Sequence, residues 1–302
     1  MQTVQHSAQT LKTALISKNS VLVSQYEKSD VGEQRLLNEA FQPANGLFGP
    51  ITLHSQSDWI TSHPEASQDF EQFFSDPDRR TPSPDKRSIY LQSIGHILKF
   101  LKKKKPDDAF CVVGITMIDL YPRDSWNFVF GQASLTDGVG IFSFARYGSD
   151  FYSLHYEGRV KTLQKTSLRD YSIFDDYYIP EITSVLLLRS CKTLAHEIGH
   201  IFGLRHCQWL ACLMQGSNHL EEADRRPLNL CPICLRKLQC AVGFSIAERY
   251  KALLSWIDGE STDAPAVAPK RSHEESVNIP KPVEAFKDWR GWIFKCLAVL
   301  QE

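Results

Sequence analysis

The chain has 302 residues, which is enough to bury a substantial core in one large domain or two small ones. It carries 34 Lys and Arg residues against 35 Asp and Glu residues, a formal net charge of −1. This balance gives no support for a nucleic-acid or membrane-surface partner, since both favour a basic excess.

No apolar run approaches the roughly 18 residues that a membrane span requires. The first residues also lack the apolar stretch that is typical of a secretory signal. We therefore expect a cytoplasmic protein with no membrane partner, in which thiols stay reduced. The eight cysteines of the chain then need an explanation other than a disulfide framework.

The N-terminal region, residues 1–87, is poorly determined by its sequence pattern. Residues 16–26 could hold a helix or a strand, and residues 75–87 form a proline-rich loop. From Ser88 the apolar residues recur at helical spacing, which predicts a helix that Pro106 ends.

The middle of the chain is expected to form strands followed by helices. Segments 109–120, 126–133 and 139–147 are rich in β-branched and aromatic residues, which predicts strands. A long helix is expected at about 182–203, and the apolar spacing of 245–257 predicts an amphipathic one.

The last part of the chain changes composition twice. Residues 258–282 are polar and rich in proline and charge, which is typical of a linker. Residues 283–302 regain apolar residues at helical spacing, which predicts a C-terminal helix that docks on the body.

One motif on the long helix has the spacing of a metal site. His196 and His200 are four residues apart, so their imidazoles point the same way and can share one ion. Glu197 leaves the helix about 100° away and can flank the ion without binding it. Gly203 can end the helix, after which His206 can supply a third nitrogen.

Three histidines and one open position are typical of a catalytic zinc site. Zinc lowers the pKa of a bound water towards about 7, and Glu197 can then act as general base. A zinc deaminase would separate His and Glu by one residue and would use cysteine ligands. Because His196 and Glu197 are adjacent, the peptidase pattern fits better.

The cysteines form a second candidate metal site. Two close pairs, Cys207 with Cys212 and Cys231 with Cys234, have the spacing of a four-cysteine structural zinc site. Scattered buried cysteines or disulfides are the alternatives, and Cys240 could compete as a ligand. The cysteines outside residues 207–234 are expected to be inert thiols, and these are Cys111, Cys191, Cys240 and Cys296.

The motif HExxHxxGxxH followed by Met214 resembles the metzincins, and the cysteine spacing resembles the archaemetzincins in particular. The resemblance implies two zinc ions, one catalytic and one structural. It implies Glu197 as the base and Met214 as an apolar turn beneath the site. The implied catalytic ligands are His196, His200 and His206, and the implied structural ligands are Cys207, Cys212, Cys231 and Cys234. Length and C-terminal helix are more similar to the shorter, second vertebrate branch of that family.

The expected fold is α/β, with a metzincin-like zincin domain over 88–257. It would have a twisted, mixed, mostly parallel sheet with an antiparallel edge strand, a long active-site helix and a Cys-rich, zinc-stabilised C-terminal subdomain. The four-cysteine segment spans 207–234, and a linker at 258–282 leads to the helix at 283–302.

Substrate binding is expected on an edge strand that pairs with an extended peptide. The candidate residues on this strand are Val139, Gly140, Ile141, Phe142 and Ser143. An ordinary sheet edge is the alternative. Other polar residues that could serve the cleft or its loop are His219, Asn218, Asp224, Tyr147, Tyr152 and Tyr156.

The predicted function is zinc-dependent hydrolysis of a peptide or protein substrate by a monomer, with aminopeptidase and endopeptidase action both open. One alternative is a weak or inactive metzincin scaffold that binds peptides. The other is a cysteine–zinc interaction module in which catalysis is incidental.

Overall fold

The computed structural model describes residues 2–43, 46–93, 101–103, 105–117, 119–120, 128–134, 136–148, 151, 181–260 and 279–302. The chain divides into two compact units. The first unit comprises the described residues of Met1–Pro82, Phe202–Lys270 and Lys281–Glu302. The second comprises those of Ser83–Ile201 and Arg271–Pro280.

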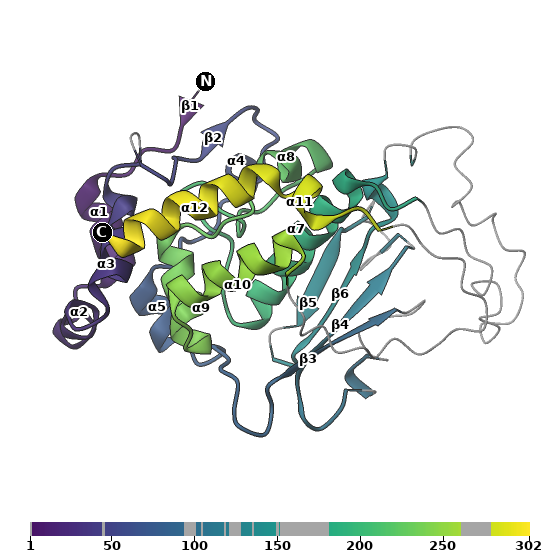
Figure 1. Ribbon diagram of the computed structural model, residues 1–302, viewed down its shortest axis with the longest axis horizontal. Coiled ribbons are helices and arrows are strands. Elements are labelled where there is room, and N and C mark those ends of the chain that lie inside the picture. The colour runs from purple at the N-terminus through teal and green to yellow at the C-terminus, as the bar shows by residue number, and fades with distance from the viewer. Residues whose placement is uncertain are drawn as a thin grey trace, which may run out of the picture. The chain divides into compact units, whose positions relative to one another are not determined.

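The second unit contains a four-stranded sheet, in the order β3-β4-β6-β5 (Figure 1). Its strands are β3 (Ser88–Ser93), β4 (Ala109–Thr116), β5 (Gly131–Ser134) and β6 (Val139–Ser143). Strands β3, β4 and β6 run parallel, whereas β5 pairs antiparallel with β6. The expected mixed sheet with an antiparallel edge strand is therefore confirmed.

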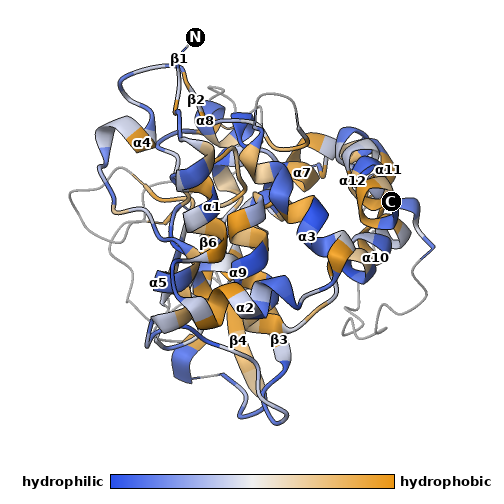
Figure 2. Cartoon of the chain, turned by 90° about the vertical axis from the view of Figure 1, so that its left-hand side faces the viewer, coloured by the Kyte–Doolittle hydropathy of each residue, from blue (hydrophilic) through white to orange (hydrophobic). Residues whose placement is uncertain are grey.

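Strand β4 lies inside the sheet because it is apolar along most of its length, as the hydropathy colouring of Figure 2 shows. Val112 lies opposite Val139 of β6 in the parallel register. The side chains of β4 are buried on both faces of the sheet, which is typical of a strand in a parallel sheet. Both valines belong to a core cluster that also contains Leu101, Ala109 and Ile141.

The helix expected from Ser88 is wrong over residues 88–93, which form β3. Ile89 lies opposite Cys111 and Leu91 opposite Val113, so pairing with β4 outweighs the local helical spacing. Helical backbone is present further along, at 101–103. The part of the prediction at 94–100 lies outside the described residues.

Helix α7 (Ser184–Ile201) packs on β5 and β6, and it confirms the long helix expected at 182–203. The hydroxyl of Thr183 accepts a hydrogen bond from the Leu186 N–H and starts the helix. The short 3-10 helix η2 (Ala145–Tyr147) follows β6. The Tyr147 hydroxyl is hydrogen-bonded to that of Thr193 at 2.5 Å, which ties η2 to the middle of α7.

The first unit is mainly helical. Its strands β1 (Gln2–Thr3) and β2 (Thr52–Leu53) pair antiparallel. Its helices are α1 (Ala8–Ile16), α2 (Ser20–Glu27), α3 (Val31–Asn38), η1 (Glu39–Phe41), α4 (Trp59–Ser62), α5 (Phe70–Ser75), α8 (Leu220–Arg225), α9 (Pro232–Val242), α10 (Ile246–Asp258), α11 (Pro282–Ala285) and α12 (Lys287–Gln301). Two of them confirm the helices expected at 245–257 and 283–302.

Helix α9 is central to this unit because it contacts α1, α3 and α5. Helix α12 lies along α3 and α10. The N-terminal region thus packs with the chain after residue 202 and with the C-terminal helix. This division differs from the segment boundaries expected from the sequence. None of the helices in the described part of the chain has the length and apolar character needed to cross a membrane.

Candidate metal centres

Helix α7 brings His196 and His200 together. Their Nε2 atoms are 3.0 Å apart, and their ring planes are nearly perpendicular at 89°. Two nitrogens bound to one tetrahedral zinc at about 2.05 Å would lie about 3.3 Å apart. The two imidazoles therefore already converge as a pair of zinc ligands.

Glu197 is only 8% exposed and lies against the edge strand β5. A Cβ atom added to Gly131 would approach the Cδ of Glu197 to 2.9 Å. The absence of a side chain at Gly131 therefore makes room for the carboxylate. The sequence alone did not indicate this contact, since a glycine within a strand is only a weak signal of close approach.

His206 belongs to the first unit and follows a turn at Gly203, whose φ of +97° favours glycine. Gln68 holds this turn from both sides. Its Nε2 donates to the Gly203 carbonyl at 3.1 Å, and its Oε1 accepts from the Arg205 N–H at 3.1 Å. The Nδ1 of His206 is 3.0 Å from a carboxylate oxygen of Glu65.

The four cysteines of the second motif form one buried cluster. The ligand atoms of Cys207, Cys212, Cys231 and Cys234 all lie within 4.8 Å of one another. The sulfurs of Cys207 and Cys231 are 3.7 Å apart. Two sulfurs on a tetrahedral zinc at about 2.3 Å would be about 3.8 Å apart. The cluster thus fits a four-cysteine zinc site.

The electrostatics of the cluster also favour a cation. Burial raises the pKa of the Cys212 and Cys231 thiols well above the usual thiol range. Hydrogen bonds from the other three thiols hold the pKa of Cys207 well below it. Backbone N–H groups of Met214 and Cys231 donate to the Cys212 sulfur. A divalent cation bound to the four sulfurs would stabilise them as thiolates and would offset the cost of burying their negative charge.

The other cysteines lie apart from this cluster, and all eight are free thiols. The disulfide alternative is therefore wrong. Burial raises the pKa of Cys191 to about 11 and that of Cys296 to about 12. Cys240 accepts a hydrogen bond from Arg79 and is not a member of the cluster. High thiol pKa values are typical of unreactive cysteines.

Met214 is fully buried, and its carbonyl accepts a hydrogen bond from the Cys207 N–H at 2.8 Å. Its expected burial is confirmed. Its position beneath the three histidines stays a prediction.

The edge strand expected for substrate is wrong. Strand β6, with Val139, Gly140, Ile141, Phe142 and Ser143, is buried and pairs with β4 on one side and β5 on the other. Its backbone groups are therefore already used in the sheet. Among the described strands, β5 forms the edge on this side.

The remaining polar candidates have structural roles or lie elsewhere. His219 caps α8, since its Nδ1 accepts from the Glu222 N–H at 3.2 Å. Asn218 donates to the backbone of Ser57 and to the hydroxyl of Ser62. Asp224 is exposed. The Tyr147 hydroxyl contacts Thr193, while Tyr152 and Tyr156 lie outside the described residues.

A third close group, Asp58, His219 and Glu222, was not foreseen from the sequence. Glu222 accepts the N–H groups of Trp59 and Asn218, each at 2.7 Å. Asp58 accepts from the Arg225 guanidinium at 2.7 Å. These acceptors are already occupied by protein donors, so the group holds the start of α4 against α8.

Comparison with known proteins identifies relatives of the whole chain. Residues 171–240 match the model of peptidase family M54. The chain is 70% identical over 360 aligned positions to archaemetzincin-2 of Homo sapiens, with all of both chains covered. The 360 aligned positions exceed this chain's 302 residues, so the relative has 58 residues without a counterpart here.

More distant proteins are also similar. Archaemetzincin-1 of Rattus norvegicus is 34% identical over 310 residues, covering 82% of this chain and 61% of the relative. A solved zinc-dependent peptidase of Methanocorpusculum labreanum is 29% identical, covers 46% of this chain and 68% of that one, and aligns with a TM-score of 0.33.

Proposed function

Because this chain belongs to the archaemetzincin family of zinc metallopeptidases, we propose that Glu197 is the general base for its hydrolysis of peptide bonds. The convergence of the His196 and His200 nitrogens, with the Glu197 carboxylate on the same helix, carries this proposal. The third proposed ligand is His206, which follows His200 by only six residues across the turn at Gly203.

A zinc ion held by these histidines would supply Lewis acidity for the carbonyl and would lower the pKa of water. Glu197 takes the proton from the attacking water and delivers it to the leaving amine. The carboxylate suits this role because it is largely buried and its position is limited by β5. Cys207, Cys212, Cys231 and Cys234 are proposed to hold a second zinc that is structural.

We propose that an extended peptide or protein substrate pairs with β5. This strand is the described sheet edge nearest to Glu197, since Gly131 belongs to it. Strand addition would place a peptide backbone alongside the general base. The protein is proposed to act as a monomer in the cytoplasm, and its eight free thiols agree with a reducing compartment.

The test of this function is Glu197→Gln. We expect catalytic turnover to fall by about 10²–10⁴-fold, because the amide cannot take a proton. Zinc content and thermal stability should stay at the wild-type values. Cleavage of a peptide library by the wild type, with this variant as control, would also show whether cuts occur at chain ends or inside.

Two outcomes would contradict the proposal. Undiminished turnover in Glu197→Gln would exclude the general-base role. Peptide binding without turnover in either protein would instead favour a peptide-binding scaffold.

A further inference from the structure

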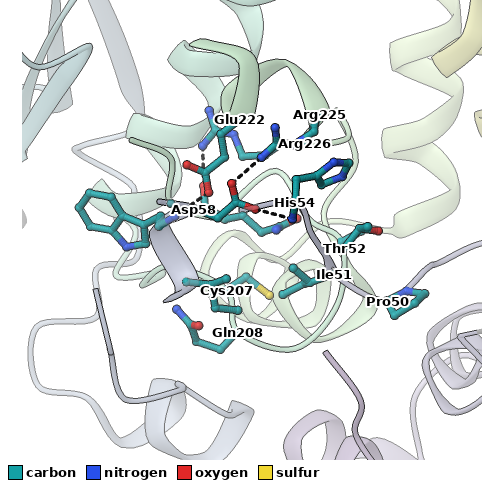
Figure 3. A pocket seen from close by; sticks show the side chains of 15 residues that line it. Pro50, Ile51, Thr52, His54, Asp58, Cys207, Gln208, Glu222, Arg225 and Arg226 are labelled. Atoms are coloured by element: carbon teal, nitrogen blue, oxygen red, sulfur yellow. Dashed lines mark hydrogen bonds and ion pairs between the residues drawn. The ribbon is translucent and has the colours of Figure 1, made fainter. Parts of the chain in front are cut away.

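A segment of the N-terminal region lies beside His206 and is tied to helix α8. We call residues 54–68 the tether. The Trp59 N–H donates to Glu222 at 2.7 Å, and Asp58 accepts from Arg225 at the same distance. These carboxylates and Arg225 line a cavity (Figure 3), and its volume is about 300 Å³.

The tether holds the imidazole of His206 from two directions. Both carboxylate oxygens of Glu65 are 3.0–3.1 Å from Nδ1 of His206. The indole of Trp59 meets the imidazole edge-on, with 5.1 Å between ring centres. Trp59 fits closely because Gly216 has no side chain: a Cβ there would approach the indole to 2.3 Å.

This contact fixes which nitrogen of His206 is available for a metal. A carboxylate can only accept, so the ring donates its Nδ1 proton to Glu65. In this tautomer of the neutral imidazole, Nε2 carries the lone pair that can bind a metal. A carboxylate in this arrangement also makes the imidazole a stronger ligand.

We propose that Glu65 is a positioning residue that orients His206 and strengthens binding of the histidine-held zinc. This inference rests on the proposed function, in which His206 is a zinc ligand. Gln68, at the end of the tether, also helps to position His206, because it holds the turn at Gly203.

The experiment measures the zinc affinity of the full chain by competition with a chelator. The histidine-held ion is identified as the one missing from His196→Ala. In Glu65→Ala, we expect its affinity to fall by roughly 10- to 100-fold, while the cysteine-held ion is unchanged. Glu65→Asp should recover part of the loss because it keeps the acceptor charge.

The control is Glu221→Ala, which removes an exposed carboxylate of α8 that forms an ion pair with Arg225. Its zinc affinities should equal those of the wild type. If Glu65→Ala does not fold by circular dichroism, Glu65→Gln is measured instead and should show a smaller loss of the same kind.

His206→Ala separates the inference from the function on which it rests. If this variant keeps full affinity for the histidine-held zinc, His206 is not a ligand and the proposed function fails. If His206→Ala loses affinity but Glu65→Ala and Glu65→Gln do not, the proposed function stands. The Glu65 contact is then an ordinary surface ion pair, and the inference is overturned.

Discussion

At the scale of single residues, the position of the Glu197 carboxylate depends on a missing side chain. Gly131 lies on β5, and any Cβ there would come within 3 Å of the carboxylate. A general base must stay within hydrogen-bond reach of its proton, so a small displacement is costly. The glycine therefore supports the proposed role of Glu197 although it has no functional group.

We predict that Gly131→Ala lowers kcat by about 100-fold, because the new methyl group pushes the Glu197 carboxylate away. Zinc content should be unchanged, since Glu197 is not a ligand in the proposed site. The matched control is Gly140→Ala on β6, whose Cβ would make an ordinary 3.5 Å contact with Ile201. Equal kcat values in the two variants would show that Gly131 has no special role.

The candidate ligands could be predicted from the sequence because their geometry is local. His196 and His200 are one helical turn apart, and the two cysteine pairs are each within six residues. The roles of Gly131 and Glu65 could not be predicted from the sequence. Their partners are 66 and 141 residues away, and only tertiary packing brings them together.

At the scale of elements, prediction succeeded where local pattern and packing agree. Helix α10 begins after Ser245, whose hydroxyl caps it, and ends at Gly259 with a φ of +74°. Prediction from sequence failed at β3, which was expected to be helical, and at β6, which was expected to be an edge strand. Strand order is decided by pairing between distant segments. Two exposed apolar residues of β3, Ile89 and Leu91, gave the helical spacing its misleading periodicity.

The attachment of the tether is an element-scale property that depends on Asp58. Burial by itself raises the pKa of this carboxyl. The N–H groups of His54 and Ser55, the Ser55 hydroxyl and the Arg225 guanidinium outweigh it and hold the pKa below its usual range. Because the folded-state pKa is lowered, the stabilisation is fully present above pH 4 and is lost as the pH falls through the folded value.

We predict that Asp58→Asn lowers the free energy of unfolding at pH 7 by about 2 kcal/mol, since the charged hydrogen bonds are lost. The difference in Tm between variant and wild type should stay constant from pH 7 to about 4 and shrink below that. Thermal unfolding of both proteins, at pH 7 and at successively lower pH values, measures this difference in Tm. A difference that stays constant as the pH falls well below 4 would mean that the pKa of Asp58 is not lowered in the folded protein.

At the scale of the whole molecule, the cysteine cluster joins two segments of the chain, one with Cys207 and Cys212 and the other with Cys231 and Cys234. Cys231 caps α9 and Cys234 is in its first turn, so the cluster fixes the start of this helix. Helix α9 in turn packs on α1, α3 and α5 of the N-terminal region. Arg236 adds a link, since its guanidinium donates to the last carbonyls of α1 and stacks on Phe70.

Loss of the proposed structural zinc should therefore loosen the N-terminal helices as well as the cysteine segment. We predict that Cys231→Ser lowers the bound zinc from about two ions per chain to about one and lowers Tm by roughly 10 °C or more. Limited proteolysis should then cut within residues 1–82. His196→Ala should also lose one ion but keep this region protected, because it removes a ligand from the other unit. If wild type and Cys231→Ser have equal zinc content and equal protection from proteolysis, the four cysteines are ordinary buried thiols and not zinc ligands.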